Sequence, residues 1–240
     1  MFYLAHQDNI TYEIIEHKKI PASFSNFTLF FIADVHRRKI KVRTLEKIDN
    51  SIDLILIGGD FVERGVPLER MHQNICVLKK LGAPIFFVWG NNDLEANPSK
   101  MIKIFQQENV KVLEDQVISI FQANKKINLI GFRYYKESYC GPNINWDELD
   151  DCFTILLTHK PSSFYGLQTE VKKKIDLTLT GHTHGGQIRL FGFGLYSKGG
   201  LYSENSSTIL ITEGYGYTLL PLRLQTKAEC HVISLQRTFI

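Results

Sequence analysis

The segment that constrains the fold most reads Leu29-Phe30-Phe31-Ile32-Ala33-Asp34-Val35-His36. Its first five residues are a short apolar run with two aromatic rings and one β-branched side chain, which predicts a buried strand. A carboxylate and an imidazole follow where this strand ends. The segment therefore predicts a polar site at the edge of a sheet.

Four further apolar runs also end at polar motifs. They are residues 54–57 before Gly59-Asp60, 85–89 before Gly90-Asn91-Asn92-Asp93, 153–157 before Thr158-His159, and 177–179 before Gly181-His182-Thr183-His184. Segments of helical length lie at residues 39–50, 68–81 and 99–108. This alternation favours an α/β domain with a parallel sheet and right-handed crossovers. Because ligands gather beyond the carboxyl ends of such strands, we expect the five motifs to share one site.

The second half of the chain shows closely spaced strand patterns, at residues 117–121, 127–132, 188–191, 209–212 and 230–235. We expect them to form a second sheet packed on the first. The Gly-rich segment 185–200 predicts an ordered loop beside the site. With 240 residues and 44% hydrophobic content, the chain predicts a single domain over residues 1–240.

Composition limits the classes of partner. A formal charge of +3 suits anionic substrates but lacks the dense Lys/Arg character of a nucleic-acid binder, so we expect no stable nucleic-acid complex. Four widely spaced cysteines, Cys76, Cys140, Cys152 and Cys230, predict reduced thiols. No apolar stretch reaches the length of a membrane span and the first residues lack a signal-peptide pattern, which predicts a cytoplasmic protein. Peripheral membrane contact through basic or apolar loops stays open.

The polar motifs supply the ligands that a pair of divalent transition-metal ions needs, neutral imidazoles and hard oxygen donors. Asp60 is our bridging ligand, since Gly59 before it lets the backbone approach closely. The full set of predicted metal ligands is Asp34, His36, Asp60, Asn91, His159, His182 and His184. Each motif alone is common in turns and strand ends, but their joint occurrence, each after a strand, indicates a metal centre. The other histidines, His6, His17, His72 and His231, have no such context.

The ordered set D-x-H, G-D, G-N-x-D, H and G-H-x-H resembles the calcineurin-like metallophosphoesterase superfamily. The run from Gly181 to Leu190 is similar to the bacterial branch of YkuE- and YaeI-like phosphohydrolases, and Gly214-Tyr215-Gly216 with Leu220-Pro221-Leu222-Arg223 extends the likeness. The resemblance implies a four-layer α/β/β/α sandwich with two mixed sheets and a dinuclear centre. By the same carry-over, Asp34, His36, Asp60 and His184 would hold one ion, and Asp60, Asn91, His159 and His182 the other. Manganese is the expected metal, and iron, zinc and nickel also suit these ligands.

The chain departs from the family pattern at one position. Relatives place a histidine directly after the metal-binding Asn, where it can protonate the leaving group; here that residue is Asn92. An amide cannot act as a general acid, a role typically worth about 10²- to 10⁴-fold in rate. We therefore assign Asn92 and Asp93 as the catalytic pair, with Asn92 contacting a phosphate oxygen and Asp93 holding Asn92.

The resulting hypothesis is hydrolysis of a phosphomonoester or phosphodiester by a metal-bound hydroxide. The alternative is a catalytically degenerate fold that serves as a protein-binding scaffold, and a nuclease is a third possibility that the modest charge weakens. The substrate is a lipid-linked phosphoester, a nucleotide or another soluble ester. For Arg37-Arg38, two interpretations stay open: contact with a phosphate, or a place in a solvated loop. Between Arg189 and Lys198 lie three aromatic residues, Phe191, Phe193 and Tyr196. They either receive an apolar or sugar moiety of the substrate or pack against the protein. Oligomeric state cannot be read from these patterns.

Overall fold

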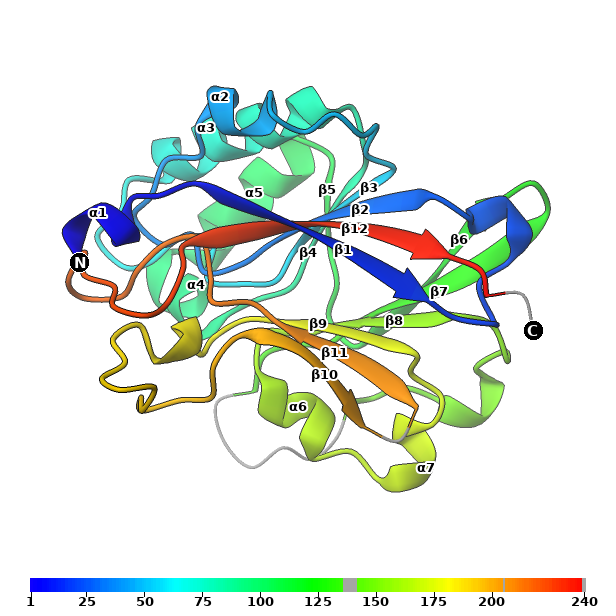
Figure 1. The fold of residues 1–240 in the computed structure, drawn as a ribbon. Helices are drawn as coiled ribbons and strands as arrows, with labels where there is room; N and C mark the ends of the chain where they lie inside the picture. The colour runs from blue at the N-terminus through cyan, green and yellow to red at the C-terminus, as the bar shows by residue number, and fades with distance from the viewer. Residues whose placement is uncertain (136–141, 205, 239–240) are drawn as a thin grey trace.

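A computed structural model describes residues 1–135, 142–204 and 206–238; Cys140 lies outside these ranges. Two six-stranded sheets pack face to face, and helices cover their outer faces (Figure 1). This arrangement confirms the predicted four-layer α/β/β/α sandwich with two mixed sheets.

The first sheet is parallel except at one strand pair, where β12 runs antiparallel to β2. In spatial order its strands are β1 (Asn9–Glu16), β12 (Glu229–Gln236), β2 (Phe27–Ile32), β3 (Leu54–Ile57), β4 (Ile85–Phe87) and β5 (Val110–Val112).

The second sheet has a parallel centre and an antiparallel strand at each edge. Its strands are β10 (Gly200–Glu204), β11 (Ser207–Ile211), β9 (Leu177–Thr180), β8 (Thr154–Leu157), β7 (Lys125–Gly131) and β6 (Gln116–Gln122).

The helices of the described residues are short. The α-helices are α1 (Phe2–Ala5), α2 (Val42–Leu45), α3 (Leu68–Leu78), α4 (Asn91–Ala96), α5 (Pro98–Gln107), α6 (Pro161–Tyr165) and α7 (Thr169–Lys172), and single 3₁₀ turns lie at Ala22–Phe24, Lys79–Leu81, Trp146–Glu148 and His184–Gly186. None of the helices in these ranges has the length and apolar character to span a bilayer.

Alternation along β2 explains why its residues from Leu29 to Ile32 are all apolar. Leu29 and Phe31 point into the core between the two sheets, whereas Phe30 and Ile32 point into the core between the first sheet and α3 and α5. Because this part of the strand is covered on both faces, the run from Leu29 to Ala33 carries no polar residue before Asp34 at the carboxyl edge.

Several predicted elements were wrong. Residues 230–235 belong to the first sheet as part of β12, because the chain crosses back after β11. Residues 188–191 form two isolated bridges and the start of a turn rather than a strand, since Gly192 allows the backbone to reverse. Residues 39–50 contain only the short helix α2.

We expect Phe31→Ala to lower the free energy of unfolding by about 3–5 kcal/mol, because it leaves a cavity in the core between the sheets. Phe31 is fully buried, whereas Phe121 is 71% exposed. Urea unfolding compares the two: Phe121→Ala should change stability by less than about 0.5 kcal/mol. Equal losses would contradict this assignment of the core.

Candidate metal centre

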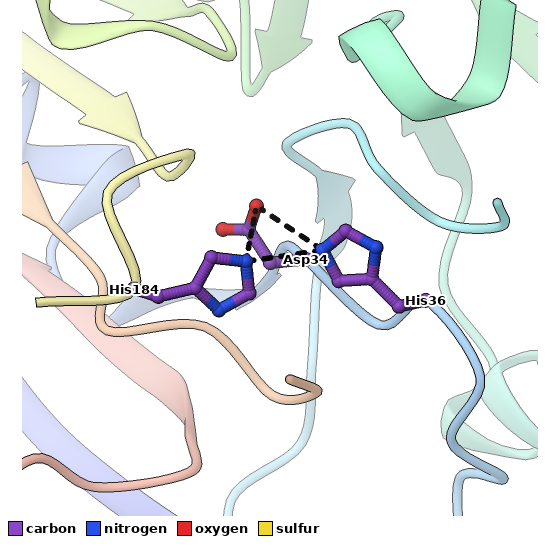
Figure 2. A group of neighbouring side chains, drawn as sticks. All are labelled: Asp34, His36 and His184. Carbon is purple, nitrogen blue, oxygen red and sulfur yellow. Dashed lines mark hydrogen bonds and ion pairs between the residues drawn. The ribbon is translucent and has the colours of Figure 1, made fainter. Parts of the chain in front are cut away.

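One group of predicted ligands joins the ends of β2 and β9. Asp34, His36 and His184 place one donor atom each within 4.8 Å of one another, and Figure 2 shows the three side chains converging. The two Nε2 atoms of His36 and His184 lie 3.0 Å apart. Asp34 Oδ1 is 3.6 Å from His184 Nε2 and 3.9 Å from His36 Nε2.

The Asp34 carboxylate tests whether a cation fits this group. Asp34 is fully buried, and its Oδ1 atom has no hydrogen-bond partner among the described residues. A buried carboxylate oxygen without a partner is costly. Because imidazole nitrogens and a carboxylate oxygen are suitable donors for a divalent transition metal, the residues fit such an ion.

A second group gathers at the ends of β3, β4, β8 and β9. Asp60, His159 and His182 also bring donor atoms within 4.8 Å. His159 Nε2 lies 3.4 Å from Asp60 Oδ2, 3.1 Å from His182 Nδ1 and 3.3 Å from Asn91 Oδ1. Asp60 Oδ2 is also 3.8 Å from His36 Nε2, so this carboxylate lies between the two groups. All seven predicted ligands therefore meet at one edge of the sandwich.

The backbone at the site is strained. Positive φ angles occur at five of the seven predicted ligands, Asp34 (54°), His36 (52°), Asp60 (49°), His182 (71°) and His184 (49°). Such conformations cost roughly 1–3 kcal/mol each and gather at functional sites. Hydrogen bonds between loops stabilise two of these conformations. Asp34 donates its backbone N–H to the carbonyl oxygen of Gly59, and His36 donates its backbone N–H to the carbonyl oxygen of Asp60.

Two glycines let neighbouring loops approach the carboxylates. A Cβ at Gly90 would lie 2.2 Å from Asp60 Oδ1, and one at Gly181 would lie 2.4 Å from Asp34 Oδ2. Any side chain at these positions would displace a predicted ligand.

Further contacts orient the imidazoles. His36 Nδ1 lies 3.0 Å from Glu63 Oε2, and His159 Nδ1 lies 2.9 Å from the carbonyl oxygen of Gly58. Contacts to the second ring nitrogen fix the orientation of a histidine that binds metal through the first. Glu63 is not among the residues predicted from the sequence, although it lies only three residues after Asp60.

Arg223 is a second residue whose role the sequence did not indicate. Its side chain is completely buried and donates to the carbonyl oxygens of Glu213, Gly214 and Gly216. Arg223 Nη2 also lies 3.3 Å from His184 Nδ1. The guanidinium thus holds the loop before β12 against the His184 turn.

Asn92 and Asp93 have separate roles. Asn92 donates its backbone N–H to Asp60 Oδ1 (2.7 Å) and its side-chain amide to Asp60 Oδ2 (2.6 Å). Asp93 is buried and accepts from the backbone N–H groups of Gly90 and Val62. The expected contact between Asp93 and Asn92 was wrong, since both Asp93 oxygens fix the surrounding loop instead.

Both interpretations of Arg38 were also wrong. Arg38 is 5% exposed, donates to the carbonyl oxygens of Gln7 and Tyr215, and pairs with Asp8. Its guanidinium carbon lies 4.2 Å from the centre of the Tyr215 ring. Arg38 therefore anchors the chain behind the site, while the exposed Arg37 pairs with Glu63.

Burial and mutual charge shift the titration of the site. Burial raises the pKa of Asp34 to about 6. Burial alone would lower the pKa of His159, but Asp60 and Asp34 outweigh it and raise that pKa to about 9. Burial together with the charge of His159 lowers the pKa of His182 to about 4. Burial likewise holds the pKa of His184 well below its usual range.

A pocket of about 560 Å³ opens on these groups. One part of its lining comes from the predicted ligands and Asn92, namely His36, Asp60, Asn91, Asn92, His182 and His184. The rest comes from two loops, namely Gly186, Gln187, Ile188, Leu195, Tyr196, Thr218, Leu219 and Leu220. Part of the Gly-rich segment therefore forms a wall of the pocket. The packing alternative for Phe191 and Phe193 was wrong, because these side chains are 93% and 82% exposed.

With this geometry established, comparison with known proteins becomes informative. The family model for calcineurin-like phosphoesterases matches residues 27–186, which run from β2 to the glycines after His184. The chain belongs to the calcineurin-like phosphoesterase family. This family membership makes the chain a metallophosphoesterase, a hydrolase that uses divalent metal ions.

Several members of the family that resemble this chain come from bacteria. The uncharacterized protein YpbG of Bacillus subtilis is 37% identical over 87% of this chain and 80% of its own length. The phosphodiesterase YaeI of Escherichia coli is 28% identical over 93% of this chain and 88% of its own length. These matches confirm the predicted bacterial branch.

A solved structure shares the fold of the family at low sequence identity. The phosphopantetheinyl hydrolase PptH of Mycobacterium tuberculosis has a TM-score of 0.53 and 13% identity, covering 81% of this chain and 91% of that protein. At this identity the likeness concerns the fold alone.

We expect the affinity for Mn²⁺ to rise with pH between about 6.5 and 8.5. Imidazoles bind metal in their neutral form, and the pKa of His159 near 9 means that an ion must displace its proton over this range. One proton released corresponds to about a tenfold gain in affinity per pH unit. Calorimetric titration with Mn²⁺ measures the change, and an Asp147→Asn variant, altered at a fully exposed carboxylate outside the site, should behave like the wild type. A constant affinity would contradict this prediction.

Proposed function

We propose that this metallophosphoesterase hydrolyses a phosphomonoester or a phosphodiester with a pair of divalent metal ions, manganese being the expected metal. The observation that carries the proposal is the position of Asp60 between two groups of buried ligands at the floor of one pocket. A carboxylate in this position can contribute to both ions.

The residues divide into two sets. Asp34, His36, Asp60 and His184 would hold one ion, and Asp60, Asn91, His159 and His182 would hold the other. When bound, such ions supply Lewis acidity toward phosphoryl oxygens and lower the pKa of water. The chain itself orients the imidazoles, since Glu63, Gly58 and Arg223 contact the Nδ1 atoms of three of the histidines. These histidines are His36, His159 and His184.

Asn92 would contact the substrate. It lines the pocket, and one N–H of its side-chain amide donates to Asp60 Oδ2, so we expect the second N–H of the same NH2 group to reach a phosphoryl oxygen. The amide cannot release its proton to a departing alkoxide. We therefore expect esters with acidic leaving groups to react fastest.

The scaffold alternative is less well supported. Positive φ angles at Asp34, His36, Asp60, His182 and His184 have a free-energy cost that a docking platform does not require. A metal-binding function gives these conformations a use, because the ligands converge through them.

We expect Asp60→Asn to weaken Mn²⁺ binding and to lower the turnover of bis(p-nitrophenyl) phosphate by more than about 100-fold, since changes even to residues behind metal ligands cost 10- to 100-fold. Metal analysis gives the bound Mn²⁺ per chain, and p-nitrophenolate absorbance gives the rate. Asp147→Asn alters a fully exposed carboxylate and is the matched control. Full turnover by Asp60→Asn in a clean preparation would refute the proposal.

We expect Asn92→His to raise the hydrolysis of diphenyl phosphate by about 10-fold or more while changing that of bis(p-nitrophenyl) phosphate little, because a general acid helps most when the leaving group is basic. The ratio of the two rates is the measurement. Asn124→His, at an exposed turn far along the chain, is the control. An equal gain on both esters would argue against a missing proton donor.

A further inference from the structure

Two loops beside the pocket present apolar side chains to solvent. Phe191 and Leu195, between β9 and β10, are 93% and 92% exposed, and Leu219, between β11 and β12, is 88% exposed. Single exposed apolar residues are normal, but a cluster of them marks a contact site. Figure 1 shows the two loops at the same end of the molecule, beside α1.

The first loop holds its tip in an ordered turn. Leu190 and Phe193 exchange two backbone hydrogen bonds of 2.9 Å, and Phe191 and Gly192 between them have φ angles of 52° and 85°. This is the pattern of a type I′ turn, which prefers Asn where Phe191 stands. A bulky aromatic residue in a left-handed conformation is unfavourable, so the turn gives no local reason for Phe191.

The two loops form one surface. The side chain of Gln187 donates to the carbonyl oxygens of Thr218 and Leu220 and accepts from the backbone N–H of Thr218. We call residues 188–196 and 217–220 the apolar rim. Because Ile188, Leu195, Tyr196, Leu219 and Leu220 also line the pocket, the apolar surface continues from the predicted metal centre to the outside.

The two chain segments that carry the rim contain basic residues and no acidic ones. Residues 181–203 and 214–228 contain no Asp or Glu but include Arg189, Lys198, Arg223 and Lys227. Of these, Lys198 and Lys227 are exposed. Exposed apolar side chains flanked by lysines are the chemistry that binds anionic lipid surfaces.

We propose that the apolar rim docks on an anionic lipid bilayer and that the substrate is a phosphoester carrying a lipid moiety. This inference rests on the proposed phosphoesterase function. The near-complete exposure of Phe191, Phe193 and Leu195 means that they protrude, which suits insertion among acyl chains better than a flat protein interface. A protein seated on the rim would cover the pocket mouth, whereas a bilayer presents its substrate there.

Sedimentation with vesicles tests the docking surface. The probes are vesicles of phosphatidylcholine with and without phosphatidylglycerol. The variant is Phe191→Asn with Phe193→Ser, in which Asn suits the type I′ turn, and the control is Phe121→Ser, which removes a phenylalanine that is 71% exposed on β6. We expect the wild type and the control to bind the phosphatidylglycerol vesicles, and the rim variant to bind them at least about tenfold more weakly.

Removing a positive charge beside the rim tests the same docking surface independently of the apolar side chains. Lys198→Gln should weaken binding to the phosphatidylglycerol vesicles by about fivefold. Absence of wild-type binding, or equal binding by the rim variant, would overturn the proposal. Light scattering detects a second copy as the occupant: a dimer that the rim variant converts to monomer, with vesicle binding unchanged, would also overturn it.

Two esters with the same leaving group separate this inference from the proposed function. The rim variant should hydrolyse soluble bis(p-nitrophenyl) phosphate at the wild-type rate, and hexadecyl p-nitrophenyl phosphate in phosphatidylglycerol vesicles about tenfold more slowly than the wild type. Equal rates on the vesicle substrate would contradict the lipid inference alone. Failure of the wild type to hydrolyse either ester with Mn²⁺ would instead count against the phosphoesterase function.

Discussion

The arrangement of this molecule depends on keeping two carboxylates, Asp34 and Asp60, buried among imidazoles. Charges in such a place are stable only when opposite charges and hydrogen bonds compensate for lost water. Asp60 accepts hydrogen bonds from the backbone N–H and the side-chain amide of Asn92, whereas Asp34 Oδ1 has no hydrogen-bond partner among the described residues. The sandwich serves this requirement, since its two sheets bring loops from both to one edge and its packed interior fixes their separation.

Much of this could be predicted from sequence because buried parallel strands leave a simple trace. Runs such as 29–33 and 54–57 are apolar on both faces, and the polar residues that end them must lie at the sheet edge. The sequence pattern does not indicate which of the two sheets a strand joins. The apolar pattern of β12 is compatible with either sheet, and only the path of the chain after β11 assigns it to the first. β1 escaped prediction because its outer residues, such as Tyr12 and Ile14, are exposed at an edge of the sheet.

The residues that support the site were harder to predict than those that form it. Arginine side chains are usually exposed, yet those of Arg38 and Arg223 are buried and donate to backbone carbonyl oxygens. Their partners come from segments far apart in the sequence, and a linear pattern does not reveal that proximity. The exposed Phe193 illustrates the opposite error, since an aromatic residue between Gly192 and Gly194 suggests packing, whereas the tertiary structure leaves it in solvent.

The position of β12 has a consequence for how the chain folds. This strand, Glu229–Gln236, lies between β1 and β2, so the edge strand β1 cannot join the rest of the first sheet until β12 is in place. The loop before it also completes the Asp34 turn, because Tyr215 and Gly216 donate to the carbonyl oxygens of Ala33 and Asp34. Pairings of such long sequence separation form slowly. A nascent chain on the ribosome would therefore leave the facing edges of β1 and β2 unpaired, and the Asp34 turn incomplete, until β12 and the loop before it had been synthesised.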